Sequence, residues 1–121
     1  MSDLFRAHIL EHSQNPRNFR ALKKADWKLA AKNPQCGDDL NIYLIMDGQT
    51  IKVATFTGEG CALSVAGASV LTDWLKGRKI SEVKKLTFAK FKRDLLKINP
   101  APGRLKCASL AFNTVKNRFG D

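Results

Sequence analysis

Hydrophobic and polar positions alternate along two neighbouring stretches in the first half of the chain. Residues 40–46 place Leu40, Ile42, Leu44 and Met46 on one face, and residues 50–56 alternate in the same way. Between them, Asp47-Gly48 is typical of a two-residue hairpin loop. A shorter stretch, Trp27–Lys32, stops at Asn33-Pro34 and predicts a third strand. Together the three stretches predict a small, mostly antiparallel sheet.

A helical spacing of hydrophobic residues precedes and follows these strands. Ser2 is expected to cap a helix that runs to about His12 and stops at Asn15-Pro16. One face of this helix carries Phe5, Ile9 and His12. After Gly58-Glu59-Gly60 a longer helix is expected, with Gly77 as the residue just past its end. Its apolar face contains Leu63, Ala66, Gly67, Val70, Leu71, Trp74 and Leu75.

Three further helices are expected in the last third of the chain. Ser81 and Thr87 are predicted caps of two short helices, the second with Phe88, Phe91, Leu95 and Leu96 inward. A rigid connector, 99–103, precedes a last helix over about 105–118. That helix is expected to bury Leu105, Ala108, Phe112, Val115 and Phe119. Strands followed by helices predict an α+β fold, with a three-stranded sheet packed by helices.

The length and composition agree with one folded domain over residues 1–121. The sequence is 44% hydrophobic and 26% charged, which is ordinary for a globular protein and excludes disorder and coiled-coil bias. No apolar run is long enough to span a membrane, and the first residues do not resemble a secretory signal. We therefore expect a cytoplasmic protein.

The net charge of +10 is concentrated in one third of the chain. Between Thr72 and Lys106 there are eleven basic and three acidic residues. This predicts a partner with an acidic surface, either a protein or a nucleic acid. The plain alternative is a solvated helical face.

Three cysteines are the candidate chemistry of the chain. Their odd number, without an export signal, argues against a disulfide framework, so they are thiols or metal ligands. Cys36 lies on the loop into the hairpin, Cys61 opens the long helix, and Cys107 lies in the first turn of the last helix. At the helix N-terminus, the dipole favours the Cys61 thiolate. All three lie at junctions between loops and elements, where side chains from separate parts of a chain can converge.

The carboxylate of Asp38 follows Cys36 by two residues and can supply a fourth ligand. Three thiolates and one carboxylate suit zinc or an iron–sulfur unit, but the oxygen holds a soft metal less firmly than a fourth thiolate would. A site of this kind is expected to exchange its contents. The spacing of the cysteines matches no zinc-finger template.

Four blocks of the sequence resemble, in order, the iron–sulfur cluster assembly scaffold family that includes IscU, SufU and the NifU N-terminal domain. They are His12-Ser13-Gln14-Asn15-Pro16-Arg17-Asn18, Asn33-Pro34-Gln35-Cys36-Gly37-Asp38, Gly58-Glu59-Gly60-Cys61-Ala62 with Ser64 and Ser69 beyond it, and Arg104-Leu105-Lys106-Cys107-Ala108. Each cysteine lies inside its own block, and the resemblance covers nearly the whole chain.

The resemblance implies a surface site of Cys36, Asp38, Cys61 and Cys107 that holds a nascent [2Fe-2S] cluster or Zn²⁺. It further implies that a cysteine desulfurase delivers persulfide sulfur, with Cys61 or Cys107 as the acceptor, and that apoproteins receive the product. Such a protein is a scaffold or a persulfide relay rather than an ordinary enzyme. Self-association into a homo-oligomer is left open.

Two departures from the family pattern divide its subfamilies. IscU proteins carry a histidine before the last cysteine and a Leu-Pro-Pro-Val-Lys stretch, where this chain has Lys106 and Pro100-Ala101-Pro102-Gly103-Arg104. The blocks around Cys61 and Cys107 look more like SufU, whose members bind zinc and relay sulfur. SufU proteins, however, carry an added segment between these cysteines, and the interval in this chain is too short to contain it. The subfamily is therefore left open. As cations beside Cys107, Lys106 and Arg104 can tune its thiolate, but a protonated lysine cannot ligate a metal.

Two other classes of function are weaker alternatives. His8-Ile9-Leu10-Glu11-His12 spells the H-x-x-E-H motif of a group of zinc proteases, but the chain is short for a protease cleft. A nucleic-acid-binding module would use the basic stretch. Against this, Trp74, Phe88 and Phe91 fall on apolar helical faces rather than among exposed cations.

Overall fold

A three-stranded antiparallel sheet and a set of helices on one of its faces make up the computed structural model, which describes residues 3–35 and 37–120. The strands are β1 (Trp27–Asn33), β2 (Asp38–Asp47) and β3 (Thr50–Glu59), in the order β1-β2-β3. The predicted α+β fold and sheet are confirmed, and each strand is longer than the alternation indicated. Ser2 and Cys36 lie outside the described residues.

The hairpin loop was predicted at Asp47-Gly48, but in the structure it lies one residue later. Asp47 is still paired with Thr50, so the two loop residues are Gly48 and Gln49. Gly48 has φ +61°, the conformation that the first position of a tight hairpin requires. A bulge between Ile45 and Met46 shifts the register near this end of the hairpin.

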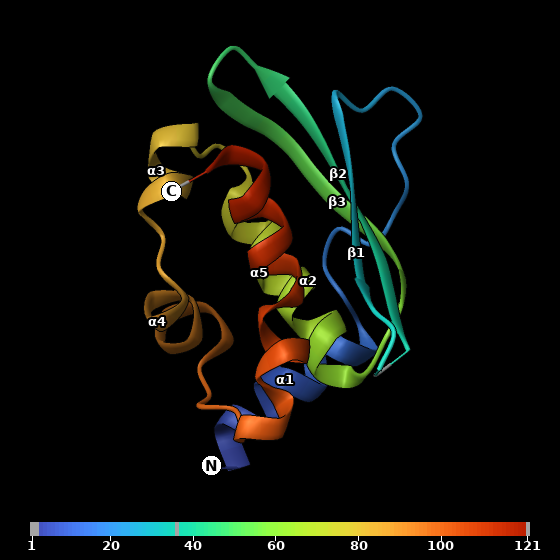
Figure 1. Ribbon diagram of the computed structural model, residues 1–121, viewed down its shortest axis with the longest axis vertical. Coiled ribbons are helices and arrows are strands. Elements are labelled where there is room, and N and C mark those ends of the chain that lie inside the picture. Colours follow the sequence, from blue (N-terminus) through green and yellow to red (C-terminus); the bar gives the residue numbers. More distant parts are fainter. Residues whose placement is uncertain (1–2, 36, 121) are drawn as a thin grey trace.

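Two long helices cover the inner face of the sheet, and Figure 1 shows them side by side. They are α2 (Ala62–Leu75) and α5 (Leu105–Phe119). Gly67 lets them approach closely, because a Cβ there would lie 3.3 Å from the Ala108 carbonyl oxygen. The helix α1 (Asp3–Gln14) packs against α2. Cys61 is the N-cap residue of α2 and Gly77 lies just past its end with φ +79°, both as predicted.

The remaining helices lie on the far side of α2 and α5 from the sheet (Figure 1). The helix α3 (Ile80–Lys85) begins after Lys79, so Ser81 is inside the helix and the prediction that it is the cap was wrong. Glu82 explains this start, because its carboxylate accepts the Lys79 backbone N–H at 3.1 Å. Lys116 on α5 donates to the carbonyl oxygens of Val83 and Lys84 and holds the end of α3.

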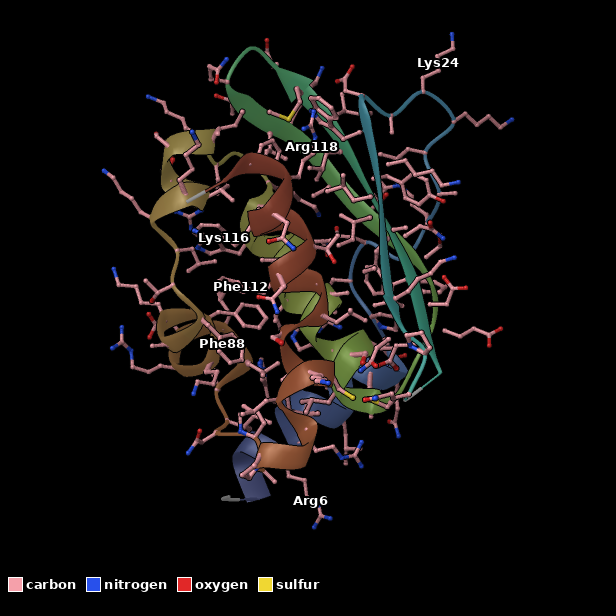
Figure 2. All side chains as sticks on the ribbon, viewed as in Figure 1. Arg6, Lys24, Phe88, Phe112, Lys116 and Arg118 are labelled. Carbon is pink, nitrogen blue, oxygen red and sulfur yellow. The ribbon has the colours of Figure 1, made fainter. Side chains whose placement is uncertain are left out.

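Thr87 caps the next segment as predicted, since its hydroxyl accepts the Lys90 N–H at 3.2 Å. The expected single helix is instead α4 (Phe88–Lys90) followed by a π-helical turn, η1 (Phe91–Leu96). The wider turn brings Phe91 and Leu96, five residues apart, to the same buried side. In Figure 2, Phe88 faces Phe112 on α5, with ring centres 5.6 Å apart.

The last helix has the predicted bounds within one residue, but Leu105 was wrongly expected to be buried. It is 37% exposed, because it lies in the first turn of α5, next to the short 3-10 turn η2 (Pro102–Arg104). Ala108, Phe112 and Val115 are buried as predicted, and Phe119 is half-buried. Among the described helices, none is long and apolar enough to cross a membrane.

Candidate metal centre

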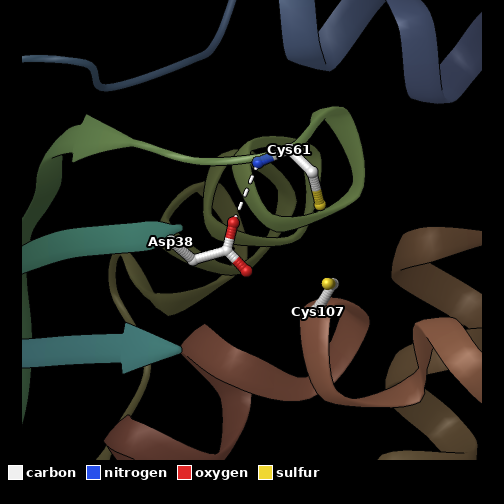
Figure 3. A group of neighbouring side chains, drawn as sticks. All are labelled: Asp38, Cys61 and Cys107. Atoms are coloured by element: carbon white, nitrogen blue, oxygen red, sulfur yellow. Dashed lines mark hydrogen bonds between the residues drawn. The ribbon is translucent and has the colours of Figure 1, made fainter. Parts of the chain in front are cut away.

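Asp38, Cys61 and Cys107 meet where the start of β2 and the end of β3 face the first turns of α2 and α5. Their ligand atoms all lie within 4.8 Å of one another, and Figure 3 shows the carboxylate and both sulfur atoms turned toward a common point. Asp38 is the first residue of β2, Cys61 caps α2, and Cys107 is the third residue of α5. Within the described part of the chain, the structure thus brings together three of the four predicted ligands. Cys36, the fourth, lies outside it.

Asp38 is held in place by the helix that carries Cys61. Its Oδ1 atom accepts the Cys61 backbone N–H at 2.9 Å, drawn as the dashed line in Figure 3. The residue is only 2% exposed, and its second oxygen, Oδ2, has no hydrogen-bond partner among the described residues. A buried carboxylate oxygen without a partner is costly, and coordination of a cation would satisfy it.

Two glycines make the close approach of Asp38 to Cys61 possible. A Cβ at Gly60 would lie 2.7 Å from the Asp38 carboxylate, so a side chain there would displace it. Gly58 has φ +124°, and a Cβ there would collide with the Asp39 carbonyl oxygen. Their place in the cysteine block was visible in the sequence, but the contact with Asp38 was not.

The Cys61 thiol is half-buried and is favoured as a thiolate. Burial acts to raise its pKa, but hydrogen bonds from the Ser64 hydroxyl and backbone N–H and from the Cys107 thiol outweigh it. The net effect is a pKa below the ordinary value. The Ser64 hydroxyl lies 3.3 Å from Sγ. Sequence reasoning gave Ser64 no role, although its position three residues after an N-cap was a usable signal.

Cys107 differs from Cys61 in exposure. It is 1% exposed, whereas Cys61 is half-buried. The two cations expected to tune Cys107 are both exposed: Arg104 is the last residue of η2, and Lys106 is the second residue of α5.

The histidines of the H-x-x-E-H motif are engaged elsewhere. His8 Nε2 lies 3.0 Å from the Leu95 carbonyl oxygen, and His12 Nδ1 lies 2.7 Å from the Ser69 hydroxyl. Glu11 pairs with Arg17 at 3.0 Å. Within the described chain these residues form no cluster of metal ligands, so the protease alternative has no support.

An α+β domain with two thiols and a carboxylate gathered at one end of its sheet has the features of a small metal-binding domain. The sequence model of the NifU-like N-terminal domain matches residues 4–120. The chain therefore belongs to the NifU-like N-terminal domain family, and the resemblance noted in the sequence is confirmed.

Relatives in this family carry names from both of its branches. The zinc-dependent sulfurtransferase SufU of Bacillus subtilis is 29% identical over 134 aligned positions, covering 96% of this chain and 89% of that protein. The iron–sulfur cluster assembly enzyme IscU of Drosophila melanogaster is 31% identical over 122 positions, covering 98% and 77%. The iron–sulfur cluster assembly scaffold protein IscU 1 of Archaeoglobus fulgidus is 34% identical, covering 93% and 72%.

Solved structures show the same fold at lower identity. A nitrogen-fixing NifU-like protein (N-terminal) from Brucella abortus superposes with a TM-score of 0.71 and 21% identity, covering 91% of this chain and 88% of that one. A crystal structure of a hypothetical protein gives a TM-score of 0.82 at 24% identity, with 98% of each chain covered.

Proposed function

We propose that this chain is an iron–sulfur cluster assembly scaffold that receives sulfur from a cysteine desulfurase and holds a labile [2Fe-2S] cluster or a zinc ion. The observation that carries the proposal is the convergence of Asp38, Cys61 and Cys107 within 4.8 Å at one end of the sheet. The family supports it, since relatives are named as assembly scaffolds and as a zinc-dependent sulfurtransferase.

The donor set fits a soft metal. Thiolate sulfurs bound to one tetrahedral zinc at about 2.3 Å lie about 3.8 Å apart, which is within the present span of the three described ligand atoms. Asp38 Oδ2 is buried and unpartnered among the described residues, so it is available as the oxygen ligand. We assign the fourth place to Cys36, which precedes Asp38 by two residues in the chain. The metal, when bound, supplies Lewis acidity and holds sulfide or thiolate.

Sulfur transfer needs a thiolate that can reach a donor persulfide. The thiolate attacks the outer sulfur of the desulfurase persulfide, the S–S bond there breaks, and the desulfurase cysteine leaves as a thiolate. A new persulfide forms on the scaffold without net oxidation. Cys61 and Cys107 both remain proposed acceptors. Cys61 is half-buried and Cys107 is almost fully buried, so transfer to Cys107 would need movement of the first turn of α5.

Release of the product to acceptor apoproteins follows from the same donor set. Asp38 is a poorer partner than a thiolate for a soft metal, and it also accepts a hydrogen bond from Cys61. The carboxylate can therefore dissociate from the metal while its other oxygen, Oδ1, still accepts the Cys61 N–H. Such reactive thiols need a reducing compartment, so we propose that the chain, a single domain over 1–121, works in the cytoplasm.

A zinc-dependent sulfur relay is the second candidate. Lys106 stands where IscU proteins carry histidine, which favours a relay. The length of the alignment with SufU argues against a relay. That alignment runs over 134 positions, more than the 121 residues of this chain, so SufU contains residues that this chain lacks. The IscU alignment runs over 122 positions, close to the length of this chain.

One experiment separates the two candidates. The protein is purified without oxygen, its iron, zinc and acid-labile sulfide are measured, and it is then incubated with a cysteine desulfurase, cysteine and ferrous iron. A scaffold acquires iron, sulfide and charge-transfer absorption near about 420 nm. A relay keeps one zinc and instead raises desulfurase turnover. If the protein does neither, the proposed function is wrong.

A further inference from the structure

A polar groove of about 350 Å³ lies between the free edge of β1 and α5, outside the metal centre. We call it the edge groove and define it by Lys32, Asn33, Lys106, Ser109, Asn113 and Asn117, which line it. Figure 1 shows β1 and α5 side by side, running in opposite directions. The Arg118 guanidinium packs on the Trp27 ring, 3.5 Å from its centre, and ties α5 to β1 at the far end.

The groove contains a buried hydrogen-bond donor, the side-chain amide of Asn33. Asn33 is 8% exposed, it lines the groove, and its Nδ2 atom has no hydrogen-bond partner among the described residues. An unsatisfied buried amide N–H is unfavourable unless a ligand supplies an acceptor. The Ser109 hydroxyl, by contrast, already bonds to Leu105 and Asn113.

The charges that line the groove favour an anionic ligand. Lys32 and Lys106 line it, both are exposed, and neither makes an ion pair among the described residues. None of the described lining residues is acidic. With Asn33 Nδ2, these groups offer donors and positive charge, and a carboxylate is the complementary acceptor.

The shape of the groove selects an extended chain. β1 is an edge strand that pairs only with β2 in the described sheet, so its other side presents backbone N–H and C=O groups. Along the opposite wall, Ser109, Asn113 and Asn117 follow one another at every turn of α5. A strand added to β1 would therefore find backbone partners on one side and polar side chains on the other.

We propose that the edge groove binds an extended acidic segment of a partner protein, which adds to β1 as a fourth strand and places a carboxylate against Asn33 and Lys106. This goes beyond the proposed function and does not depend on it, because binding needs neither metal nor sulfur. Since Lys106 precedes Cys107, the bound segment would lie next to the metal centre.

The test uses an acetylated, fluorescent peptide that alternates glutamate and valine, titrated into the full chain at about 150 mM salt with anisotropy as the signal. Two matched peptides are compared, one with glutamine for glutamate and one with N-methyl groups on alternate backbone nitrogens. We expect both to bind at least about tenfold more weakly. If either binds as tightly as the parent peptide, or if free succinate does, the proposal is overturned.

Variants of the chain locate the binding site. Lys32→Gln, at an exposed position, should weaken binding about threefold, and Asn33→Asp, which keeps the shape but places a charge in the groove, at least about tenfold. Lys52→Gln, an exposed lysine on β3 outside the groove, is the matched control and should bind as wild type does. If Lys32→Gln and Asn33→Asp both bind like this control while their circular dichroism is native, the segment does not bind here.

Discussion

Cys61 shows how much of the site's chemistry depends on a few atoms around one sulfur. The sequence placed it at the start of a helix, and the structure adds the Ser64 hydroxyl at 3.3 Å and the Cys107 thiol. These hydrogen bonds outweigh the burial that would raise the pKa. Cys107, in contrast, is almost fully buried. The two thiols are therefore expected to differ in reactivity when no metal is bound.

Alkylation of the metal-free protein with iodoacetamide should modify Cys61 before Cys107. The rate at Cys61 should rise with pH through a midpoint below that of an ordinary thiol, because its pKa is lowered. Mass spectrometry of peptides from timed samples gives both rates. The Ser64→Ala variant should shift the Cys61 midpoint upward. Faster modification of the buried Cys107 would contradict this account.

Gly60 provides the sharpest test of how Asp38 is positioned. In Gly60→Ala the new methyl group would lie 2.7 Å from the carboxylate oxygen that accepts the Cys61 N–H. The carboxylate must move, so zinc affinity should fall by about tenfold or more, with a smaller change in the free energy of unfolding. Gly103→Ala is the matched control, because nothing lies within 4 Å of a Cβ there. Competition with a chromophoric chelator measures the zinc affinity of both variants. Equal affinities would contradict the claim that Gly60 positions the Asp38 carboxylate.

At the scale of elements, a buried hydroxyl connects α1 and the segment after it to α2. The Ser69 hydroxyl accepts the Arg17 backbone N–H at 2.8 Å and lies 2.7 Å from His12 Nδ1. Burial, followed by the charges of His8 and Arg17, lowers the pKa of His12. The first family block thus anchors two segments on the helix that begins at Cys61.

Stability should fall on acidification because of this histidine. Above about pH 6.5 His12 is neutral in both states, but below it the unfolded chain takes up the proton first, since the folded pKa is lower. Stability should therefore decrease as the pH falls from about 6.5 toward that folded value. Urea unfolding of the metal-free protein at pH 7.5 and 5.5 measures the decrease. His12→Asn should reduce it, and an unchanged difference would contradict the assignment.

The elements that the sequence predicted well are those with a strong period and clear end signals. The three strands and α2 needed only alternation, helical spacing and glycines. The start of α3 was missed because it depends on a carboxylate reaching back to a backbone N–H, and η1 was missed because a π-helical turn has no spacing signal of its own. Leu105 was misplaced because an apolar residue in the first turn of a helix can still face solvent.

Sequence patterns also predicted the residues of the candidate site better than the contacts between them. The four family blocks predicted its residues, and in the structure Asp38, Cys61 and Cys107 lie close together. The sequence could not show the unpartnered Asp38 Oδ2 or the edge groove, because both result from how β1, β2 and α5 pack together. Cys36 as a ligand stays a prediction.

At the scale of the whole molecule, exposed lysines lie on the helices far from the sheet. Lys84, Lys85 and Lys90 are exposed on α3 and α4, whereas Lys92 is half-buried, with its ammonium 5.2 Å from the centre of the Phe88 ring. A charge reversal at Lys92 would therefore also remove a cation–π contact, which makes it a poor probe of surface charge. The three exposed lysines are the better set.

Reversal of Lys84, Lys85 and Lys90 to glutamate should slow association with an acidic partner, the desulfurase in our proposal, by about tenfold at low salt. The difference should shrink as added salt shortens the Debye length to about 8 Å at 0.15 M. Stopped-flow mixing with the desulfurase measures the rates. Reversal of Lys23, Lys24 and Lys52, three exposed lysines outside the basic stretch, is the control. Equal rates for both triple variants at low salt would mean that the basic stretch only solvates the helices.

The central claim is that Cys36, Asp38, Cys61 and Cys107 hold one metal ion or cluster together. The most direct measurement is the metal and sulfide content per chain, after anaerobic purification and reconstitution, of wild type and of Cys36→Ser, Asp38→Ala, Cys61→Ser and Cys107→Ser. Loss of a thiolate leaves a four-ligand site one strong bond short, so each serine variant should lose most of its metal. Asp38→Ala should keep a bound cluster but transfer it to an acceptor apoprotein more slowly than wild type does. Full occupancy in any one cysteine variant that is still folded would contradict the claim.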